Sequence, residues 1–423
     1  MSKQKKDVIW NALGSLVYAL ASMILSFLVI RLQGADDGGI FGFGFSTLGQ
    51  QMFIIAYFGI RPFHITDMKN EYSFGDYLYT RRLTSGLAVL SACGFLWYMV
   101  LRQDYSVHKA LILFLLCLYK IADGYADVYE SELQRQGLLY RTGQSLFYRT
   151  LFSVLCLTVC LAVTRNLLLS CAVSVLMQLI GTEFFAVRIL RRDTAADYHM
   201  RRGACTSLLK NTGLLFVSVF LDFYVFSASK YAVDAVRSDA DNGFFNILFM
   251  PTSFIYLIAN FMIRPMLTGL AEKLKEHDSR AFRTTCRRML LGVSFLSLGI
   301  LFLAAVLGRF GLSVFELLLG DAYRGSLLKE YGTFLLLILG GAFYALANVQ
   351  YYILVTMRRQ SWIFAGYVLS AVLAALTAVR FTERLGLYGA AVSYAILMAV
   401  LFLIFTMSAV LSLREMSAER RKP

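Results

Sequence analysis

Four ionisable residues recur at helical spacing inside one apolar stretch of the sequence. Lys120 and Asp123 lie three residues apart, and Asp127 and Glu130 continue along the same side of the expected helix. Charged groups are costly in a lipid environment, so they are functional candidates when they lie at membrane depth. The pattern predicts a polar stripe that faces a water-filled cavity. The alternative interpretation is a helix that ends early and leaves residues 123–132 in the cytoplasm.

Two further apolar stretches each carry a single carboxylate, Glu183 in one and Asp222 in the other. Burial favours the protonated form of a carboxyl group, so either residue could take up a proton or help to coordinate sodium. Together with Asp123, they are the candidates for ion coupling or for lining a polar cavity. The alternative for both is a hydrogen bond to a Tyr or Arg of a neighbouring helix.

Arginine stands at the end of three apolar stretches, at Arg31, Arg61 and Arg264. Arg61 and Arg264 each lie in the sequence Ile-Arg-Pro, and a guanidinium is well suited to bind the phosphate of an anionic head group. The alternative is an interfacial anchor followed by a helix-stopping proline, because proline disfavours helix at the residue before it. Arg31 precedes the acidic turn GADDGG at 34–39, which could form an outer gate or an ordinary Gly/Asp turn.

The patterns of common catalytic sites are absent from the sequence. The chain has no GxxxxGK[ST] phosphate-binding loop, no HExxH zinc motif and no GxSxG nucleophile motif. Most of its seven Cys lie inside apolar runs, and its four His are scattered over expected loops. We therefore expect no enzyme activity, no metal site and no cofactor.

The composition is that of a protein embedded in lipid. Of the 423 residues, 58% are hydrophobic and 16% are charged, and the mean hydropathy is +0.62. A soluble domain carries roughly a quarter charged residues, so this chain has too few to cover a water-facing surface. The net charge is +14, but the basic residues lie between the apolar runs and do not form one patch. This distribution argues against a nucleic-acid partner.

Twelve stretches are long enough to cross a bilayer, which takes about 20 mostly apolar residues. They lie near residues 8–30, 41–60, 83–101, 109–131, 147–164, 168–188, 207–228, 243–263, 289–308, 331–355, 362–379 and 387–412. Most of the 41 Lys and Arg residues fall in every second connection, beginning with the N-terminus. Since cytoplasmic segments are rich in these residues, we expect both termini in the cytoplasm.

The two halves of the chain resemble each other in sequence. Residues 41–62 read FGFGFSTLGQQMFIIAYFGIRP, and residues 244–265 read FFNILFMPTSFIYLIANFMIRP. Both are the second span of their half and end in IA-x-F-x-IRP. Six spans in each half give the halves the same orientation. We therefore expect an all-α membrane protein with two pseudo-symmetric six-helix lobes, 1–192 and 207–423, joined by a cytoplasmic linker at 193–206.

Five motifs occur in a fixed order along the chain. They are N-x-L-G-S-L-x-Y from Asn11, R-L-Q-G-A-D-D-G-G-I-F from Arg31, Y-F-G-I-R-P-F from Tyr57, D-G-Y-A-D-V-Y-E-S-E-L-Q-R-Q-G from Asp123 and F-M-I-R-P-M-L-T from Phe261. In this order they resemble bacterial polysaccharide-biosynthesis flippases of the Wzx type. These flippases belong to the MOP superfamily, which also holds the MATE drug exporters and the lipid II flippases.

The resemblance implies a fold and a substrate. The fold has two six-helix lobes around a cavity that opens alternately to each side of the bacterial inner membrane. The substrate is an undecaprenyl-diphosphate-linked oligosaccharide, whose diphosphate is accommodated by basic residues as the molecule moves from the inner to the outer leaflet. The matching basic residues here are Arg31, Arg61, Lys120 and Arg264. The other expected partners are membrane lipids, with protons or sodium as coupling ions.

Two other functions stay open from the sequence. A MATE-like, cation-coupled exporter of small molecules would favour an acidic cavity with aromatic side chains, whereas the candidate residues here are basic. A membrane glycosyltransferase or O-antigen polymerase would need a large outer loop with catalytic residues, and no such loop is expected between the twelve spans.

Overall fold

The computed structural model describes residues 3–67, 70–276 and 278–419. Helices joined by short turns make up these ranges, and no strand occurs in them. The chain divides into two compact units, unit 1 up to Phe220 and unit 2 from Leu221. The boundary falls inside one long helix, α10 (Ala204–Val236), which therefore contributes to both units.

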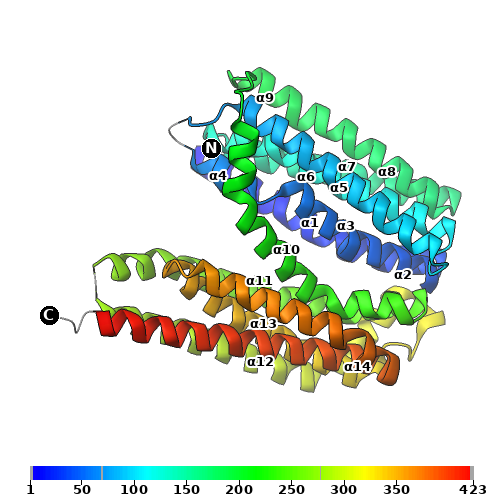
Figure 1. Ribbon diagram of the computed structural model, residues 1–423. Coiled ribbons are helices and arrows are strands. Elements are labelled where there is room, and N and C mark those ends of the chain that lie inside the picture. The colour runs from blue at the N-terminus through cyan, green and yellow to red at the C-terminus, as the bar shows by residue number, and fades with distance from the viewer. Residues whose placement is uncertain (1–2, 68–69, 277, 420–423) are drawn as a thin grey trace. The chain divides into compact units, whose positions relative to one another are not determined.

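Unit 1 holds the helices that precede α10 (Figure 1). Their bounds are α1 (Lys3–Gln33), α2 (Ala35–Phe43), η1 (Gly44–Leu48), α3 (Gly49–Tyr57), α4 (Ile60–Thr66), α5 (Phe74–Leu101), α6 (Val107–Arg135), α7 (Leu139–Thr164), α8 (Leu167–Thr182), η2 (Glu183–Val187) and α9 (Arg188–Asp193). The π-helical turns η1 and η2 lie within continuous spans, as such single-turn bulges commonly do. Helix α6 packs against α3, α5, α7 and α8, so it is the central helix of unit 1.

Unit 2 holds the second part of α10 and the helices that follow it. Their bounds are α11 (Asp239–Lys275), α12 (Ser279–Leu319), η3 (Asp321–Tyr323), η4 (Leu328–Glu330), α13 (Tyr331–Thr356) and α14 (Gln360–Glu419). Helix α13 packs against α11, α12 and α14 (Figure 1). The long α14 consists of two helices that meet at Gly386, whose φ of 63° together with ψ of −143° is readily adopted only by glycine.

The structure contains the twelve spans that the sequence predicts. Within the described ranges, ten helical segments are long and apolar enough to cross a bilayer. The central helix α6 is not among the ten, since Lys109, Lys120 and Asp123 interrupt its apolar stretch. The segment formed by α14 contains two spans, one on each side of Gly386.

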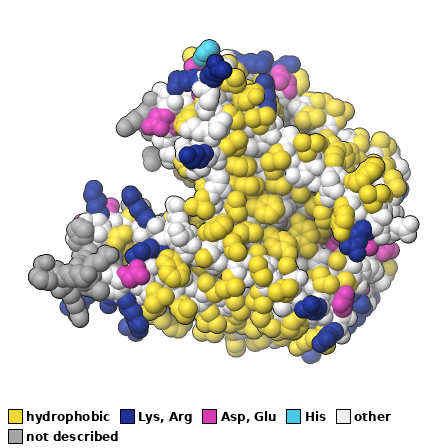
Figure 2. All heavy atoms as spheres, viewed as in Figure 1, with side chains coloured by type: hydrophobic (Ala, Val, Ile, Leu, Met, Phe, Trp, Pro, Cys, Tyr) yellow, Lys and Arg dark blue, Asp and Glu magenta, His cyan; other side chains and the backbone are white. Residues whose placement is uncertain are grey.

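Large apolar side chains cover much of the surface. On α12, Phe295, Phe302 and Phe310 are 71%, 68% and 71% exposed. Figure 2 shows hydrophobic side chains over much of the visible surface, with only scattered charged side chains. This surface would be unfavourable in water and is stable in hydrocarbon, where α-helices also satisfy every backbone hydrogen bond internally. The chain is therefore a multi-pass, all-α membrane protein.

Serine caps fix the beginnings of α5 and α6, the helices that carry Arg81 and the polar stripe. At α5, the Ser73 hydroxyl accepts a hydrogen bond from the Asp76 backbone N–H at 3.1 Å, and the Asp76 carboxylate accepts one from the Ser73 N–H at 2.9 Å. At α6, Ser106 caps the Lys109 N–H at 3.1 Å. These caps start both helices earlier than their apolar stretches alone would indicate.

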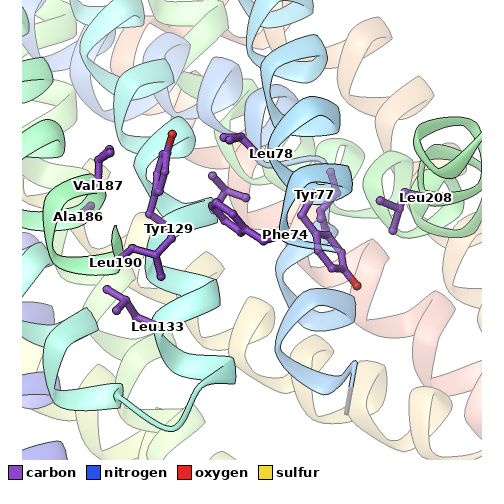
Figure 3. Close-up of a cluster of buried hydrophobic side chains, with 11 residues drawn as sticks. Phe74, Tyr77, Leu78, Tyr129, Leu133, Ala186, Val187, Leu190 and Leu208 are labelled. Carbon is purple, nitrogen blue, oxygen red and sulfur yellow. The ribbon is translucent and has the colours of Figure 1, made fainter. Parts of the chain in front are cut away.

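A hydrophobic cluster lies at one end of unit 1 and holds six of its helical elements together (Figure 3). Its members are Ile60 of α4, Phe74, Tyr77 and Leu78 of α5, Val128, Tyr129 and Leu133 of α6, Ala186 and Val187 of η2, Leu190 of α9 and Leu208 of α10. Ile60 precedes Arg61, and Val128 follows Asp127. The packing of this cluster therefore fixes the backbone on which those two charged residues stand.

The two Ile-Arg-Pro segments differ in structure, and in neither does the proline stop a helix. In unit 1 the helix breaks earlier, at Phe58 and Gly59, which both have positive φ, and Pro62 lies in the first turn of α4. Proline is tolerated there because the first backbone N–H groups of a helix have no intrahelical partner. In unit 2, α11 continues past Pro265 to Lys275. The interpretation of a helix-stopping proline is thus wrong in both halves.

Candidate functional site

The polar stripe predicted on the fourth span exists as one continuous helix face. Helix α6 runs unbroken to Arg135, so it does not end before Asp127. Lys120, Asp123 and Glu130 are each 4% exposed and Asp127 is 6% exposed. The stripe does not line an open space, because side chains of α1, α4, α5 and α7 cover it.

Two arginines from different helices bind the Asp127 carboxylate. Arg81 of α5 donates to Oδ2 at 3.0 Å, and Arg61 of α4 donates to Oδ1. The Arg81 guanidinium also donates to the Ala56 carbonyl oxygen at 2.8 Å, and Arg61 donates to the Gln134 amide oxygen at 2.8 Å. The Arg81 side chain is fully buried, whereas that of Arg61 is 26% exposed. Asp127 therefore joins α4, α5 and α6.

A third arginine binds the other two carboxylates of the stripe. Arg149 of α7 donates to Asp123 Oδ1 at 2.5 Å and to Glu130 Oε1 at 3.1 Å. Glu130 Oε1 also accepts the Ser145 hydroxyl at 2.8 Å. Both ion pairs are almost fully withdrawn from the surface, with 1% of the Arg149 side chain exposed. Such pairs hold α6 and α7 in one relative position, because a movement that breaks a pair leaves a buried charge uncompensated.

Lys120 is left as the uncompensated cation of the stripe. Its Nζ donates to the Tyr18 hydroxyl at 3.1 Å and lies 4.1 Å from the ring centroid of Phe45. No carboxylate of the described chain lies within ion-pair distance of it; Asp123, one turn away, binds Arg149 and the Tyr18 hydroxyl. The missing side chain of Gly49 makes room for the lysine, because a Cβ there would lie 3.0 Å from Lys120 Cγ.

The other basic residues predicted to bind substrate have environments of their own. Arg61 is bound to Asp127 and Gln134, as described above. Arg31 lies in the last turn of α1 and is exposed. Arg264 lies in α11 of unit 2, and its side chain is outside the described part of the structure.

Asp222 stands in a polar, aromatic environment inside unit 2. The Tyr344 hydroxyl of α13 donates to both carboxylate oxygens at 3.1 Å, and Tyr367 of α14 is a second hydrogen-bond donor. Nearby, Asn260 Oδ1 accepts the Asn348 amide at 3.2 Å and the Tyr352 hydroxyl at 3.2 Å. Asp222 therefore makes the interhelical hydrogen bonds to tyrosine that the sequence left open as its alternative role.

Glu183 differs from the other carboxylates. It lies in η2 with 45% of its side chain exposed, and it pairs with Arg188 at 3.3 Å. A half-exposed ion pair of this kind contributes little to stability. The structure places Glu183 at the surface of unit 1 and apart from the buried stripe of α6.

Among the described residues, four buried basic side chains were not singled out in the sequence: Arg81, Lys109, Arg149 and Lys230. They lie close to the expected ends of apolar stretches, where a basic residue is expected to be an interfacial anchor. For Arg81, the Ser73–Asp76 capping pattern was a usable signal, because it begins α5 two turns before that residue. Lys230 lies six residues before the end of α10 and is 7% exposed.

His64 and Glu132 form a buried pair beyond the expected end of the fourth span. His64 Nε2 donates to Glu132 Oε2 at 2.7 Å, and the imidazole stacks on the Tyr77 ring at a centroid distance of 3.9 Å. Burial lowers the pKa of His64 below its usual value, although Glu132 opposes this effect. Burial alone would raise the pKa of Glu132, but hydrogen bonds from His64, Arg135 and Gln136 outweigh it and lower that pKa to about 2. The pair is a neutral imidazole bound to a carboxylate.

The described residues show no metal-binding cluster. No group of three or more His, Cys, Asp or Glu in these ranges could hold a metal ion, and the seven Cys are free thiols. The described site instead holds Lys120 and three carboxylate-bound arginines in unit 1, and a tyrosine-bound carboxylate in unit 2.

Comparisons with known proteins identify the fold. No protein-family model matches the chain, and no curated protein matches it in sequence. An inward-facing multidrug resistance MATE family transporter of the MOP superfamily is similar in structure, with 10% identity, a TM-score of 0.74 and coverage of 96% of both chains. The lipid II flippase MurJ in an inward closed conformation has 11% identity and a TM-score of 0.70, over 97% of this chain and 90% of its own.

A third similar structure is a MOP superfamily transporter from Pyrococcus furiosus, described as having a binding pocket of reverse polarity that suggests a different function. It has 13% identity and a TM-score of 0.58, over 99% of this chain and 97% of its own. At 10–13% identity these likenesses establish the fold. The chain has the architecture of the MATE and MOP superfamily transporters.

Proposed function

We propose that the protein is a flippase of the Wzx type in the bacterial cytoplasmic membrane. It moves a polyprenyl-diphosphate-linked oligosaccharide, such as an undecaprenyl-linked one, from the inner to the outer leaflet for the synthesis of cell-surface polysaccharide. The observation that carries this proposal is Lys120, a buried ammonium without a carboxylate partner in a network whose three arginines are all paired. The protein makes and breaks no bond in this process, and so is not an enzyme.

The chemistry of the substrate explains why a buried cation is useful. An oligosaccharide head cannot cross hydrocarbon, and its diphosphate adds negative charge that must be compensated inside the membrane. A lysine without a carboxylate partner can supply this compensation, because an incoming phosphate does not have to displace an internal anion. The polyprenyl chain can stay in the bilayer while the head passes between the two lobes, 1–192 and 207–423, by alternating access.

The other basic residues have proposed roles that follow from their environments. Arg31 and Arg264 are proposed phosphate contacts at the ends of their spans. Arg61 is a proposed contact that must first release Asp127, which would then keep Arg81 and the Ser131 hydroxyl as partners. Its partial exposure, 26% of the side chain, makes Arg61 the arginine of the network best able to exchange partners.

Asp222 is the proposed coupling residue for protons or sodium. Its two hydrogen-bonded tyrosines hold the carboxylate in place without supplying a positive charge, so an external cation or proton has to do so. Asp123 is less suited to this role because Arg149 already compensates it. Glu183, paired with Arg188 at the surface, remains a second proposed coupling carboxylate.

The test of the function is export of surface polysaccharide by cells that carry only a variant protein. Lys120→Ala should abolish export at a normal level of membrane-inserted protein, and Lys120→Arg should retain part of it because the charge is kept. Lys109→Ala is a matched control, since Lys109 is also a buried lysine of α6 that lies over an aromatic ring, Tyr105, at 4.2 Å. Full export by Lys120→Ala would refute the proposal for this residue.

A second candidate function is a MATE-like exporter of cationic small molecules, coupled to protons or sodium. The carboxylate of Asp222, hydrogen-bonded to tyrosines, favours it, as do the MATE transporters of the same fold. A drug-susceptibility assay separates the two functions. An exporter should lower the susceptibility of a sensitive host to cationic drugs, whereas a flippase should restore polysaccharide export and leave drug susceptibility unchanged.

A further inference from the structure

One face of α10 carries an ionisable or aromatic residue at every turn within unit 2. Asp222, Phe226, Lys230 and Asp234 follow one another at intervals of four residues, so they lie one above the other on the helix. Phe226 packs against Phe249 and Tyr344, and this contact shows that the face points into unit 2. Lys230 continues the face one turn beyond Phe226.

The Lys230 side chain is buried and rests on an aromatic ring. It is 7% exposed, and its Nζ lies 4.4 Å from the ring centroid of Phe249 in α11. The nearest carboxylate along the helix is that of Asp234, one turn further, which accepts a hydrogen bond from the Asn242 amide at 3.2 Å. In the described chain, no carboxylate and no hydrogen-bond acceptor lies within bonding distance of Lys230 Nζ.

This lack of a partner sets Lys230 apart from the buried basic residues of unit 1. Arg81 and Arg149 each bind a carboxylate, and His64 binds Glu132. Lys120 has the Tyr18 hydroxyl as an acceptor. A cation–π contact recovers a small part of the solvation energy that an ammonium loses on burial, so Lys230 is an unfavourable residue for the stability of the fold. A charge retained under those conditions indicates a function.

The two units share this arrangement of a buried lysine over a phenylalanine. In unit 1, Lys120 lies over Phe45, and in unit 2, Lys230 lies over Phe249. Both phenylalanines belong to the repeated second span, and the repeat that aligns Phe41 with Phe244 places Phe45 and Phe249 within one residue of each other. The lysines themselves come from helices that are not equivalent, α6 and α10.

We propose that Lys230 is an anion-binding residue of unit 2 and that its ligand is a phosphate of the lipid-linked diphosphate. This inference rests on the proposed function and extends it by a residue on a helix that carries none of the other basic candidates. The flexible four-carbon stem of lysine allows the ammonium to leave the Phe249 ring and meet a phosphate oxygen. The gain is a charge-assisted hydrogen bond where the unliganded protein has none.

The experiment measures lipid binding to the purified full-length protein by native mass spectrometry. The probe is geranylgeranyl diphosphate, and geranylgeraniol is the comparison without an anion. Inorganic diphosphate tests the anion without a lipid, and phosphatidylglycerol tests an ordinary membrane phosphate. The variants are Lys230→Met, Lys230→Arg and the control Lys109→Met, and the melting temperature of each is measured in the same detergent.

The expected result is a loss of binding without a loss of stability. Lys230→Met should weaken binding of geranylgeranyl diphosphate at least about tenfold, since a charge-assisted hydrogen bond is lost. Its melting temperature should stay the same or rise, because an unpaired buried charge has been removed. Lys230→Arg should keep most of the affinity, and Lys109→Met should bind as the wild type does. Binding of geranylgeraniol should be the same in all variants.

Four results would overturn the inference, and they are distinguishable. Wild-type affinity for the diphosphate in Lys230→Met would show that the lysine does not bind it. A lowered melting temperature together with weaker binding would assign Lys230 to the packing of α10 on α11. An equal loss of phosphatidylglycerol or inorganic diphosphate binding would show that the site takes phosphate from any source. If the wild type itself does not prefer the diphosphate over the alcohol, the proposed function fails together with the inference.

Discussion

Arg149 of α7 donates a hydrogen bond to Asp123 of α6 at 2.5 Å, with at most 5% of either side chain exposed. The same guanidinium binds Glu130 two turns along α6. Asp123 and Glu130 therefore hold α6 and α7 together, whereas Lys120 of the same stripe has a tyrosine hydroxyl as its hydrogen-bond partner.

Removing the charge of Arg149 should destabilise the protein severely. Arg149→Met leaves two buried carboxylates uncompensated, and breaking a buried pair in this way costs about 3–5 kcal/mol. Arg141→Met is the matched control on the same helix, because its partner Asp193 and its own side chain are partly exposed, at 18% and 25%. That variant should lose less than about 1 kcal/mol. Melting curves of the two detergent-solubilised variants decide the matter, and equal melting temperatures would contradict the structural role of Arg149.

The two arginines on Asp127 should differ in what their loss affects. Arg81→Ala removes a fully buried group that also binds the Ala56 carbonyl oxygen, so the amount of inserted protein should fall strongly. Arg61→Ala leaves Asp127 bound to Arg81, so the protein should insert at a near-normal level. Fluorescence-detected size-exclusion chromatography of fusion proteins measures both amounts.

Transport by the Arg61 variants then tests the proposed phosphate contact. Polysaccharide export per inserted molecule should fall in Arg61→Ala and in Arg264→Ala, and the double variant should be inactive. Unchanged specific transport in the double variant would remove both arginines from the set of substrate contacts, while the fold would be unaffected.

The His64–Glu132 pair predicts that mild acid destabilises the protein. The pKa of His64 is lowered in the fold, so below about pH 6.5 the unfolded chain binds a proton that the folded protein does not, and stability falls as the pH drops from 7 towards 5. Glu132, with a pKa of about 2, is ionised throughout this range, and its contribution is lost only as the pH falls from about 4.5 towards 2.

Melting temperatures at pH 7.5, 6 and 5 measure this effect. His64→Gln should flatten the fall between pH 7 and 5, because the glutamine amide can still donate to Glu132 without titrating. His108→Gln, at an exposed position, should change nothing. A wild-type protein that becomes more stable between pH 7 and 5 would show that His64 is protonated in the fold, contrary to this prediction.

Asp222→Asn should separate coupling from folding. The asparagine side chain can still accept a hydrogen bond from Tyr344, so inserted protein should stay near the wild-type amount. Transport should be lost, since the amide neither ionises nor binds a proton. Tyr344→Phe, which keeps the carboxylate and removes one donor, should reduce transport and leave part of it. Wild-type transport by Asp222→Asn would exclude the residue from coupling.

The expected orientation can be tested by labelling single cysteines in a variant without its native Cys. Cysteine at Asp278, between α11 and α12, should react only from the cytoplasmic side, and cysteine at Asp104, between α5 and α6, only from outside. The reason is the excess of Lys and Arg in the connections assigned to the cytoplasm. Labelling of position 278 from outside would invert the topology and leave the twelve spans in place.

The number of spans and the all-helical class followed from the sequence because they depend on local properties. A stretch of about 20 apolar residues must cross the bilayer as a helix, whatever its neighbours are. The repeat with Ile-Arg-Pro in each half was equally visible. The carboxylates of α6 could also be identified as unusual from the sequence, because a charged residue inside an apolar stretch is visible without knowledge of its partner.

The partners of those charges were decided by the tertiary structure alone. Arg81 lies 46 residues from Asp127, and Arg149 lies 26 residues from Asp123. Which side chains meet over such separations depends on the rotation and packing of whole helices. In addition, the span boundaries expected from hydropathy placed Arg81 and Lys230 outside the membrane helices. Burial also depends on the neighbouring helices. The sequence shows only that Lys230 lies near the end of an apolar stretch. The packing of α10 on α11 buries this lysine over the ring of Phe249, with no carboxylate of the described chain beside it.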